Sequence, residues 1–327
     1  MMPEPEKVEI TALVTWLGMR KKIKNPAVLF LGARAGGLFR SQELCDILQP
    51  FSKRTLHELS QSHRFEECYK VLSQRQFSER ELDSILTQSL QHITHTDADV
   101  CIADMVKQGI FDVIISSNID DLIEDSFVQV EMRELFDYDV FIPEHMTPEG
   151  SIYHERPLPC KVIKAFGALS SKKYCIIERG AYLDSSQNLK NLLETYLTQD
   201  VLAVGLDPTW DEEILRMFPT QGGVFWLVGE EELMNRAVFA RIVRARQAKY
   251  LVDSEQHEIW KAIYWHLHGG MPINFQLIHN IDRQLQAISR DMQLLKRDTQ
   301  DIRKDVQELH ILFQRLYERQ LTGHDKT

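Results

Sequence analysis

The stretch FDVIISSNIDDLIE, residues 111–124, decides the fold that the sequence predicts. Residues 111–115 are a short apolar run rich in β-branched side chains, which is typical of a buried strand. Residues 116–118 are polar, and from Asp120 the apolar residues recur at helical spacing. In open α/β sheets, ligands bind where such strands end. We therefore expect Asn118 and Asp120 to lie at a ligand site.

A second strand is predicted upstream, at residues 27–31 (AVLFL), where all side chains are apolar. The sequence GARAGG follows it at once, at residues 32–37, and a helix is expected from about Ser41. A strand, a glycine turn and a helix form the layout of a phosphate cradle, because missing Cβ atoms let backbone N–H groups approach a phosphate.

The rest of the first 270 residues alternates apolar runs with helical patterns. Strands are expected at 161–164, 174–177, 201–206 and 224–228, and helices at 8–22, 96–109, 122–130, 189–197, 211–217, 230–247 and 255–268. Residues 42–108 are predicted to form a helical subdomain, and residues 137–159 a loop. The pattern predicts an α/β domain over residues 1–270, with a doubly wound, mostly parallel (Rossmann-like) sheet.

Composition sets limits on the partners of this chain. It has 327 residues, of which 43% are hydrophobic, with a net charge of −10 and a pI of about 5.7. An acidic balance disfavours a surface devoted to nucleic acid or anionic lipid. No apolar run is long enough to cross a bilayer. We expect a cytoplasmic protein with no nucleic-acid or membrane partner.

Cysteine and histidine patterns give no metal signal. The five cysteines are scattered without a C-x-x-C pair, which is typical of a reduced intracellular protein with buried thiols. His92, His95 and Asp97 are interpreted as a polar loop ahead of a helix, because no third strong ligand motif lies nearby. No metal cofactor is expected.

Residues 271–327 carry a heptad repeat that predicts a long C-terminal coiled-coil helix for oligomerisation. Its apolar positions alternate by four and three, with Thr299 as the polar exception. They are Ile281, Leu285, Ile288, Met292, Leu295, Ile302, Val306, Leu309, Phe313 and Leu316.

The charges beside this repeat favour a parallel homo-oligomer. With Ile281 at position d, acidic residues fall at g (291, 298 and 305) and basic ones or histidine at e (296, 303 and 310). Opposite charges then face each other in a parallel pair, whereas an antiparallel pair would place like charges together. The number of chains stays open, and a helix folded back on its own domain is the alternative.

Three blocks of the sequence resemble the sirtuin-like NAD-binding family, especially its prokaryotic branch in antiviral defence proteins. The blocks are LFLGARAGGLFR at 29–40, ISSNIDDLIE at 115–124, and KVIKAFGAL at 161–169 followed by VLAVGLDPTWDEEIL at 201–215. Their order and spacing cover residues 8–252.

This resemblance implies a set of site residues. Gly32 and Ala33 match the glycine turn that wraps the NAD phosphates, and Arg40 aligns with a later Phe-Arg pair. Asn118 and Asp120 match the residues that hold the nicotinamide ribose and carboxamide. From the residues alone, Asn118 and Asp120 have an equally good interpretation as caps of the following helix.

Two departures from the family pattern bear on activity. Phe166 stands where the family has its catalytic histidine, and losing a general base costs on the order of 10²- to 10⁴-fold in rate. Arg34 replaces the second glycine, where it either obstructs a pyrophosphate or clamps a phosphate of NAD or ADP-ribose through its guanidinium. His145 and His154 are the loop histidines nearest to the expected mouth of the site.

The sequence thus favours a catalytically impaired sirtuin-like domain, a pseudoenzyme held in a homo-oligomer by its coiled coil. We expect it to act as a scaffold, sensor or regulatory component of a prokaryotic antiviral defence system, with a defence protein as a potential partner. The alternative is an NAD glycohydrolase that depletes NAD once oligomerised. Protein deacylation is disfavoured, because the zinc-binding cysteines of deacylating sirtuins have no counterpart here.

Overall fold

The two strands predicted at residues 27–31 and 111–115 lie side by side at the centre of the sheet in a computed structural model of the chain. β2 (Ala27–Leu31) pairs with β3 (Phe111–Ser116) on one side and with β8 (Val201–Val204) on the other. The eight-stranded sheet has the order β1-β10-β9-β8-β2-β3-β5-β4, and each pairing in it is parallel. Its other strands are β1 (Glu6–Lys7), β4 (Tyr138–Phe141), β5 (Cys160–Lys164), β9 (Phe225–Gly229) and β10 (Lys249–Val252).

This strand order confirms the predicted fold. From β5 through β3, β2, β8 and β9 to β10, the chain is wound outward in both directions from β2, as in a Rossmann sheet. All five residues of β2 are buried, and so are all four of β8. Burial on both faces explains why these strands are continuous apolar runs instead of alternating ones.

The structure describes residues 6–272 except 75–76, 144–157, 247 and 253–257, together with Ile288 and Met292. The chain divides into two units, residues 1–271 and 272–327. Apart from residues 271–272, Ile288 and Met292, the segment predicted as a coiled coil lies outside the described residues, and so do His145 and His154.

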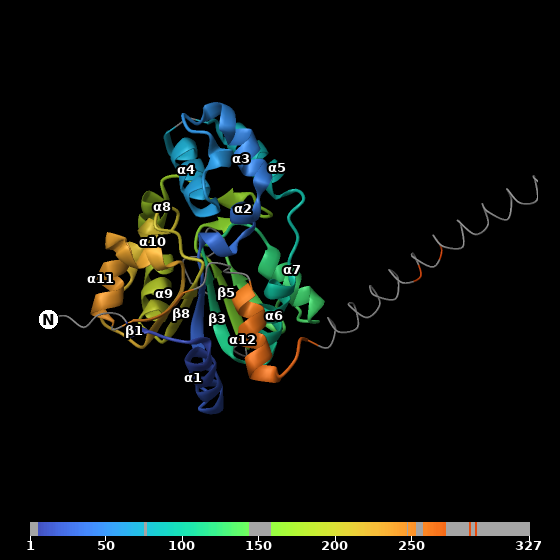
Figure 1. Ribbon diagram of the computed structural model, residues 1–327, viewed down its shortest axis with the longest axis vertical. Helices are drawn as coiled ribbons and strands as arrows, with labels where there is room; N and C mark the ends of the chain where they lie inside the picture. Colours follow the sequence, from blue (N-terminus) through green and yellow to red (C-terminus); the bar gives the residue numbers. More distant parts are fainter. Residues whose placement is uncertain are drawn as a thin grey trace, which may run out of the picture. The chain divides into compact units, whose positions relative to one another are not determined.

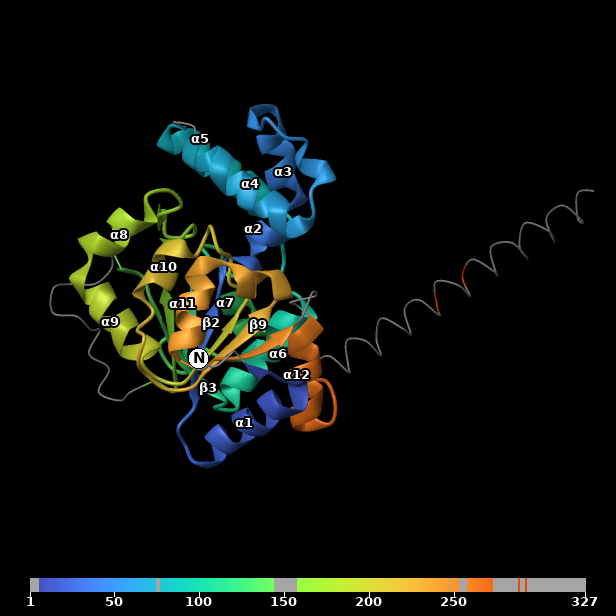
Figure 2. The same ribbon diagram turned by 60° about the vertical axis from the view of Figure 1, so that its left-hand side comes forward.

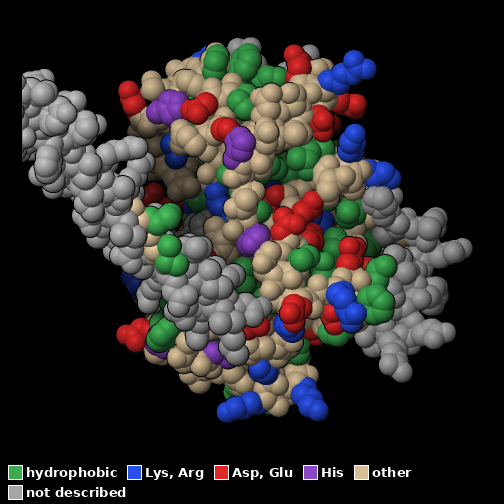
Figure 3. Space-filling view, turned by 90° about the vertical axis from the view of Figure 1, so that its right-hand side faces the viewer, with side chains coloured by type: hydrophobic (Ala, Val, Ile, Leu, Met, Phe, Trp, Pro, Cys, Tyr) green, Lys and Arg blue, Asp and Glu red, His purple; other side chains and the backbone are tan. Residues whose placement is uncertain are grey.

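Helices cover both faces of the sheet (Figure 1). One face carries α1 (Ile10–Lys22), α6 (Asp97–Lys107), α7 (Leu122–Gln129) and α12 (Glu258–His268). The other carries α8 (Arg179–Ser185), α9 (Gln187–Leu197), α10 (Glu212–Met217) and α11 (Ala237–Ala245). The described side chains on the face drawn in Figure 3 mix acidic and basic groups, in keeping with the modest net charge.

The chain between β2 and β3 forms a helical module, which we define as α3 (Gln42–Leu48), α4 (Gln61–Gln74) and α5 (Glu79–Leu90). It is preceded by a 3₁₀ turn, η1 (Ala33–Ala35), and by α2 (Gly37–Arg40), and the short turns η2 (Gln49–Phe51) and η3 (Leu56–Glu58) lie within it. Figure 2 shows the module standing apart from the two helical layers. The predicted subdomain at 42–108 also included α6, but this helix packs instead on α7 and α12.

Two predicted elements on the side of α8–α11 are wrong in detail. Of the strand expected at 174–177, only Tyr174 lies in a strand. This strand, β7 (Lys173–Tyr174), pairs antiparallel with β6 (Gly167–Ala168), outside the main sheet. The helix expected at 230–247 is divided into η5 (Glu231–Asn235) and α11. The break falls at Arg236, where the backbone is extended and the guanidinium reaches Glu66 of α4.

The edges of the sheet were also missed by the sequence prediction. β4 lies within residues 137–159, where a loop was expected, and β1 and β10 were not expected at all. These strands are only two to four residues long, so each offers too few residues for a strand pattern to be recognised. Pairing with a neighbour, and not local pattern, determines their conformation.

Candidate functional site

The backbone N–H groups of the glycine turn, residues 32–37, donate hydrogen bonds to other atoms of the protein. Six consecutive groups have an internal acceptor, four of them a carbonyl and two a carboxylate. In order they are Gly32 to Val204 O (2.8 Å), Ala33 to Asp211 Oδ2 (2.9 Å), Arg34 to Gly205 O (2.8 Å), Ala35 to Gly32 O (2.9 Å), Gly36 to Ala33 O (3.4 Å) and Gly37 to Asp120 Oδ2 (2.7 Å). A phosphate cradle needs these donors free. Asp120 and Asp211 therefore take the place of the expected anion.

The crevice between β2 and β8 is closed by backbone contact. This is the point where the winding of the sheet reverses, and where dinucleotides bind in such folds. A Cβ on Gly32 would lie 2.4 Å from Gly205 O, and one on Gly205, whose φ is +70°, would lie 2.7 Å from Ala35 N. The two loops approach so closely that only glycine fits at both positions.

Arg34 points away from the expected phosphate position, into a buried network below the helical module. Its Nε lies 2.8 Å from Asp207 Oδ2, and its Nη2 lies 3.4 Å from Glu66 Oε1 of α4. Its Nη1 lies 3.2 Å from Glu230 Oε2 and donates to Ser62 Oγ at 3.1 Å. Neither role expected of Arg34 fits this placement, because the guanidinium already faces carboxylates and does not lie over the turn.

Arg40 is fixed by a bidentate ion pair with Asp99 of α6. Its Nη1 and Nη2 lie 2.6 and 2.7 Å from the two carboxylate oxygens, and Nη2 also donates to Ala35 O at 3.0 Å. Burial alone would raise the pKa of Asp99, but the hydrogen bonds and charge of Arg40 outweigh it and hold this pKa below its ordinary value. The pair ties the glycine turn to the layer of α6.

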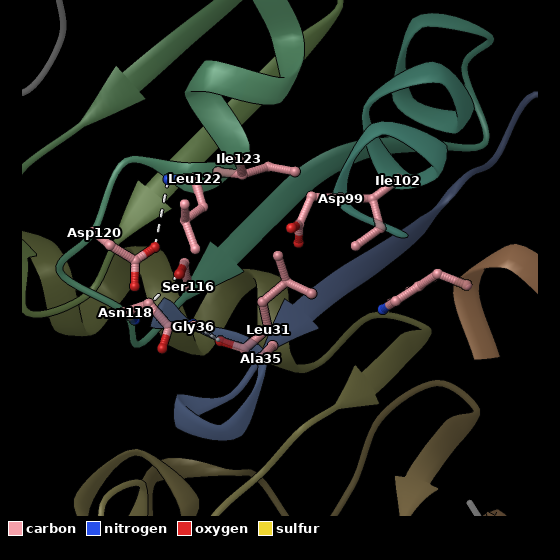
Figure 4. Close-up of a pocket in the computed structure, with 11 residues that line it drawn as sticks. Leu31, Ala35, Gly36, Asp99, Ile102, Ser116, Asn118, Asp120, Leu122 and Ile123 are labelled. Atoms are coloured by element: carbon pink, nitrogen blue, oxygen red, sulfur yellow. Dashed lines mark hydrogen bonds between the residues drawn. The ribbon is translucent and has the colours of Figure 1, made fainter. Parts of the chain in front are cut away.

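Asn118 and Asp120 come together above the turn, as Figure 4 shows. Asn118 Nδ2 donates to Gly32 O at 3.0 Å, and its Oδ1 lies so close to Gly36 that a Cβ there would be 2.1 Å away. Asp120 also accepts weakly from Leu122 N, at 3.4 Å. The main partner of each side chain is thus the glycine turn, which neither the ligand interpretation nor the helix-cap interpretation foresaw.

These residues line a cavity of about 20 Å³. Its wall is formed by Leu31, Ala35, Gly36, Asp99, Ile102, Ser116, Asn118, Asp120, Leu122, Ile123 and Trp260. That volume suits about one water molecule, whereas pockets for small ligands have roughly 300–1,000 Å³. The cavity in this arrangement cannot hold a nucleotide.

A buried lysine that sequence reasoning did not select neutralises the acidic residues beside the cavity. Lys164, at the end of β5, lies 2.9 Å from Glu124 Oε1 and 3.5 Å from Asp121 Oδ1, and it donates to the main-chain oxygen of Asp120. Burial raises the pKa of Glu124 and of Asp120, with Lys164 opposing the shift. The sequence signal that could have identified Lys164 is a charged residue at the end of a mostly apolar strand, in the block KVIKAFGAL at 161–169.

Phe166 lies in the hydrophobic core and is fully buried. The guanidinium of Arg179 lies 4.1 Å from the centre of its ring and donates to Trp210 O at 2.6 Å. Burial lowers the pKa of Arg179, against the charge of nearby Asp211. The position that the resemblance assigns to a general base is therefore a packing position for an aromatic ring and a cation.

We predict that Asp211 makes the stability of the protein depend on pH. Burial raises its pKa to about 6, despite the hydrogen bonds from Ser117, Asp207 and Ala33. The folded-state pKa exceeds the unfolded value, so protonation of Asp211 stabilises the folded protein. This contribution is fully present below about pH 4 and is lost as the pH rises to about 6. Asparagine does not ionise, so the variant Asp211→Asn lacks this loss. The free energy of unfolding of the variant minus that of the wild type should therefore increase by about 2–3 kcal/mol from pH 4 to pH 7.

Urea unfolding at several pH values checks this prediction. Asp184→Asn is the control, since that side chain is 71% exposed and its ion pair with Lys190 should contribute less than about 1 kcal/mol. A difference for Asp211→Asn that stays constant with pH would contradict a raised pKa.

The described residues offer no group of three or more histidine, cysteine, aspartate or glutamate side chains that could bind a metal ion. His92 lies 3.9 Å from Glu43 and is largely exposed. In the described part of the chain, no helix has both the length and the apolar character needed to cross a membrane.

Of the comparisons with known proteins, the one with solved structures gives a match. No protein-family model matches the sequence, and no curated protein does. Among solved structures, the chain is similar to one described as "Structural Basis for the Mechanism and Regulation of Sir2 Enzymes". The sequence identity is 13% and the TM-score 0.36, over 79% of this chain and 96% of the other. The fold assignment accordingly rests on the order and direction of the strands of this chain.

Proposed function

We propose that this protein is a catalytically impaired, sirtuin-like domain that works as an oligomeric scaffold, sensor or regulatory component. The observation that carries the proposal is the closed glycine turn, in which carboxylates of the protein occupy the N–H groups that a phosphate would need. Phe166 supports it, because an aromatic ring packed under Arg179 cannot accept a proton.

The biological setting, a prokaryotic antiviral defence system in the cytoplasm, is inferred from the sequence resemblance alone. A defence protein would then be the partner, and NAD or an ADP-ribose-like nucleotide would be the ligand if the turn opens. Opening would require Asp120 and Asp211 to release Gly37 and Ala33.

The competing function is an NAD glycohydrolase. The observation that favours it is the placement of Asn118 and Asp120 on one cavity beside Gly36. In this alternative, assembly would open the turn and a base from elsewhere in the chain would replace the missing histidine.

We expect the concentrated, purified full chain to neither bind nor cleave NAD. Titration calorimetry should give no heat of NAD binding, and chromatography should detect no release of nicotinamide, because the glycine turn is closed and Phe166 stands at the position of the family's histidine. Asn118→Ala is the matched variant. Turnover by the wild type that Asn118→Ala abolishes would overturn the proposal and establish the glycohydrolase.

Deleting residues 281–327 should lower the number of chains per particle, obtained by dividing the molar mass from light scattering by the mass of one chain. Ile288 and Met292, at successive heptad positions, are 56% and 64% exposed, so a partner helix would bury apolar surface there. As a control, replacing both with alanine in the full chain should weaken assembly without removing the segment. An unchanged number of chains per particle in both variants would show that the heptads do not hold the oligomer.

A further inference from the structure

Two cysteines of the helical module lie much closer together than their separation in sequence indicates. Cys45 of α3 and Cys68 of α4 have their Sγ atoms 3.8 Å apart, within the distance of a sulfur hydrogen bond. Both are buried, Cys45 with 4% of its surface exposed and Cys68 with none. A disulfide needs about 2.05 Å between the sulfurs, so side-chain rotation has to close a gap of about 1.8 Å.

We propose that Cys45 and Cys68 form a redox-active dithiol that hydrogen peroxide oxidises to an intramolecular disulfide. The pair is independent of the closed glycine turn and of the proposed function. Its distinguishing feature is that each thiol has the other as its neighbour, on helices that pack against each other.

The electrostatic surroundings of the pair favour reaction at Cys45. The hydrogen bond with Cys68 holds the pKa of the Cys45 thiol below its ordinary value despite burial, and the charge of Arg64 acts in the same direction. Burial raises the pKa of Cys101 to about 12. A thiolate is the reactive form of cysteine, so Cys45 should react well before Cys101.

The reaction takes place in two balanced steps. The Cys45 thiolate attacks one peroxide oxygen, the O–O bond breaks, and a sulfenic acid forms as hydroxide leaves. The sulfur of Cys68 then attacks the sulfenic sulfur, the S–O bond breaks, and the S–S bond forms with loss of water. In total, two thiols and one peroxide give one disulfide and two molecules of water.

The disulfide would link α3 to α4, and α4 is also the helix whose side chains contact Arg34. α4 carries Ser62 and Glu66, which contact the Arg34 guanidinium, as well as Cys68. Closing the loop between residues 45 and 68 should raise the melting temperature by roughly 3–10 °C. Reduction with dithiothreitol should reverse the change.

The test is non-reducing peptide mapping of the full chain after exposure to hydrogen peroxide and trapping with N-ethylmaleimide. We expect a peptide pair joined through Cys45 and Cys68, two hydrogens lighter than the reduced peptides. Cys45→Ser and Cys68→Ser should each abolish it, and Cys101→Ser should not. In Cys68→Ser, a sulfenic-acid probe such as dimedone should label Cys45.

Cys175, which is only half-buried, serves as an internal reference for the peroxide dose. If Cys175 is oxidised in the wild type while Cys45 and Cys68 both stay free for alkylation under denaturing conditions, the proposal is wrong. A disulfide that joins either residue to a different cysteine would overturn it as well. Because these readouts use the wild-type chain, they do not depend on the folding of a variant.

Discussion

Replacing Arg34 with methionine should destabilise the protein by roughly 3–5 kcal/mol, measured as the free energy of unfolding in urea. The side chain is 1% exposed, and Asp207, its partner at 2.8 Å, is completely buried. Removing the cation leaves the buried Asp207 carboxylate without its ion-pair partner, whereas Glu66 keeps Arg236. Breaking one half of a buried ion pair is costly, because the remaining charge keeps its desolvation penalty.

Arg236→Met is the matched control for this prediction. Arg236 contacts the same carboxylate, Glu66, at 3.2 Å, but its side chain is 48% exposed. Partly exposed ion pairs contribute roughly 0–1 kcal/mol, so this variant should unfold almost like the wild type. Equal losses for the two variants would show that Glu66, and not the burial of Arg34, governs the stability of the network.

The network also shows which parts of the structure the sequence could not reveal. β2 and β3 were predictable, because a buried parallel strand is a continuous apolar run and its pattern is local. The partners of Arg34 were not predictable, because Asp207 lies 173 positions away in the chain and Glu66 lies 32 positions away. Only the assembled fold brings them together.

The candidate site divides in the same way. The position of Asn118 and Asp120 just after the strand at 111–116 could be read from the sequence, since a polar run follows a mostly apolar one. Their partners could not be inferred, because a glycine turn that binds a phosphate and one that binds a carboxylate of its own chain look the same in sequence. The difference lies in Asp211, which reaches Ala33 across 178 positions.

Lys164→Met should cost a similar amount, about 3–5 kcal/mol at neutral pH, and the loss should depend on pH. Lys164 is fully buried, and burial would lower its pKa, but the charges of Glu124, Asp120 and Asp121 outweigh burial and raise it. Methionine occupies a similar volume without a charge, so packing changes little. The cost arises from leaving the carboxylates without a cation.

The direction of the pH dependence follows from these carboxylates. Burial already raises the pKa of Glu124 and of Asp120, and loss of the lysine raises both further. A folded-state pKa above the unfolded value means that stability is lost as the pH rises through it. The deficit of Lys164→Met relative to the wild type should therefore be largest near pH 8 and shrink as the pH falls, because the native carboxyls of the variant bind protons at a higher pH than ordinary carboxyls.

Lys161→Met is the control on the same strand, because Lys161 is only half-buried and contacts the hydroxyl of Tyr196 at 3.3 Å. We expect a loss below about 1 kcal/mol that does not vary with pH. A deficit for Lys164→Met that stays constant from pH 5 to 8 would mean that the side chain acts by packing alone. A deficit that shrinks toward pH 5 would identify Lys164 as the counter-charge that keeps Asp120 ionised on the Gly37 N–H, and with it the glycine turn closed.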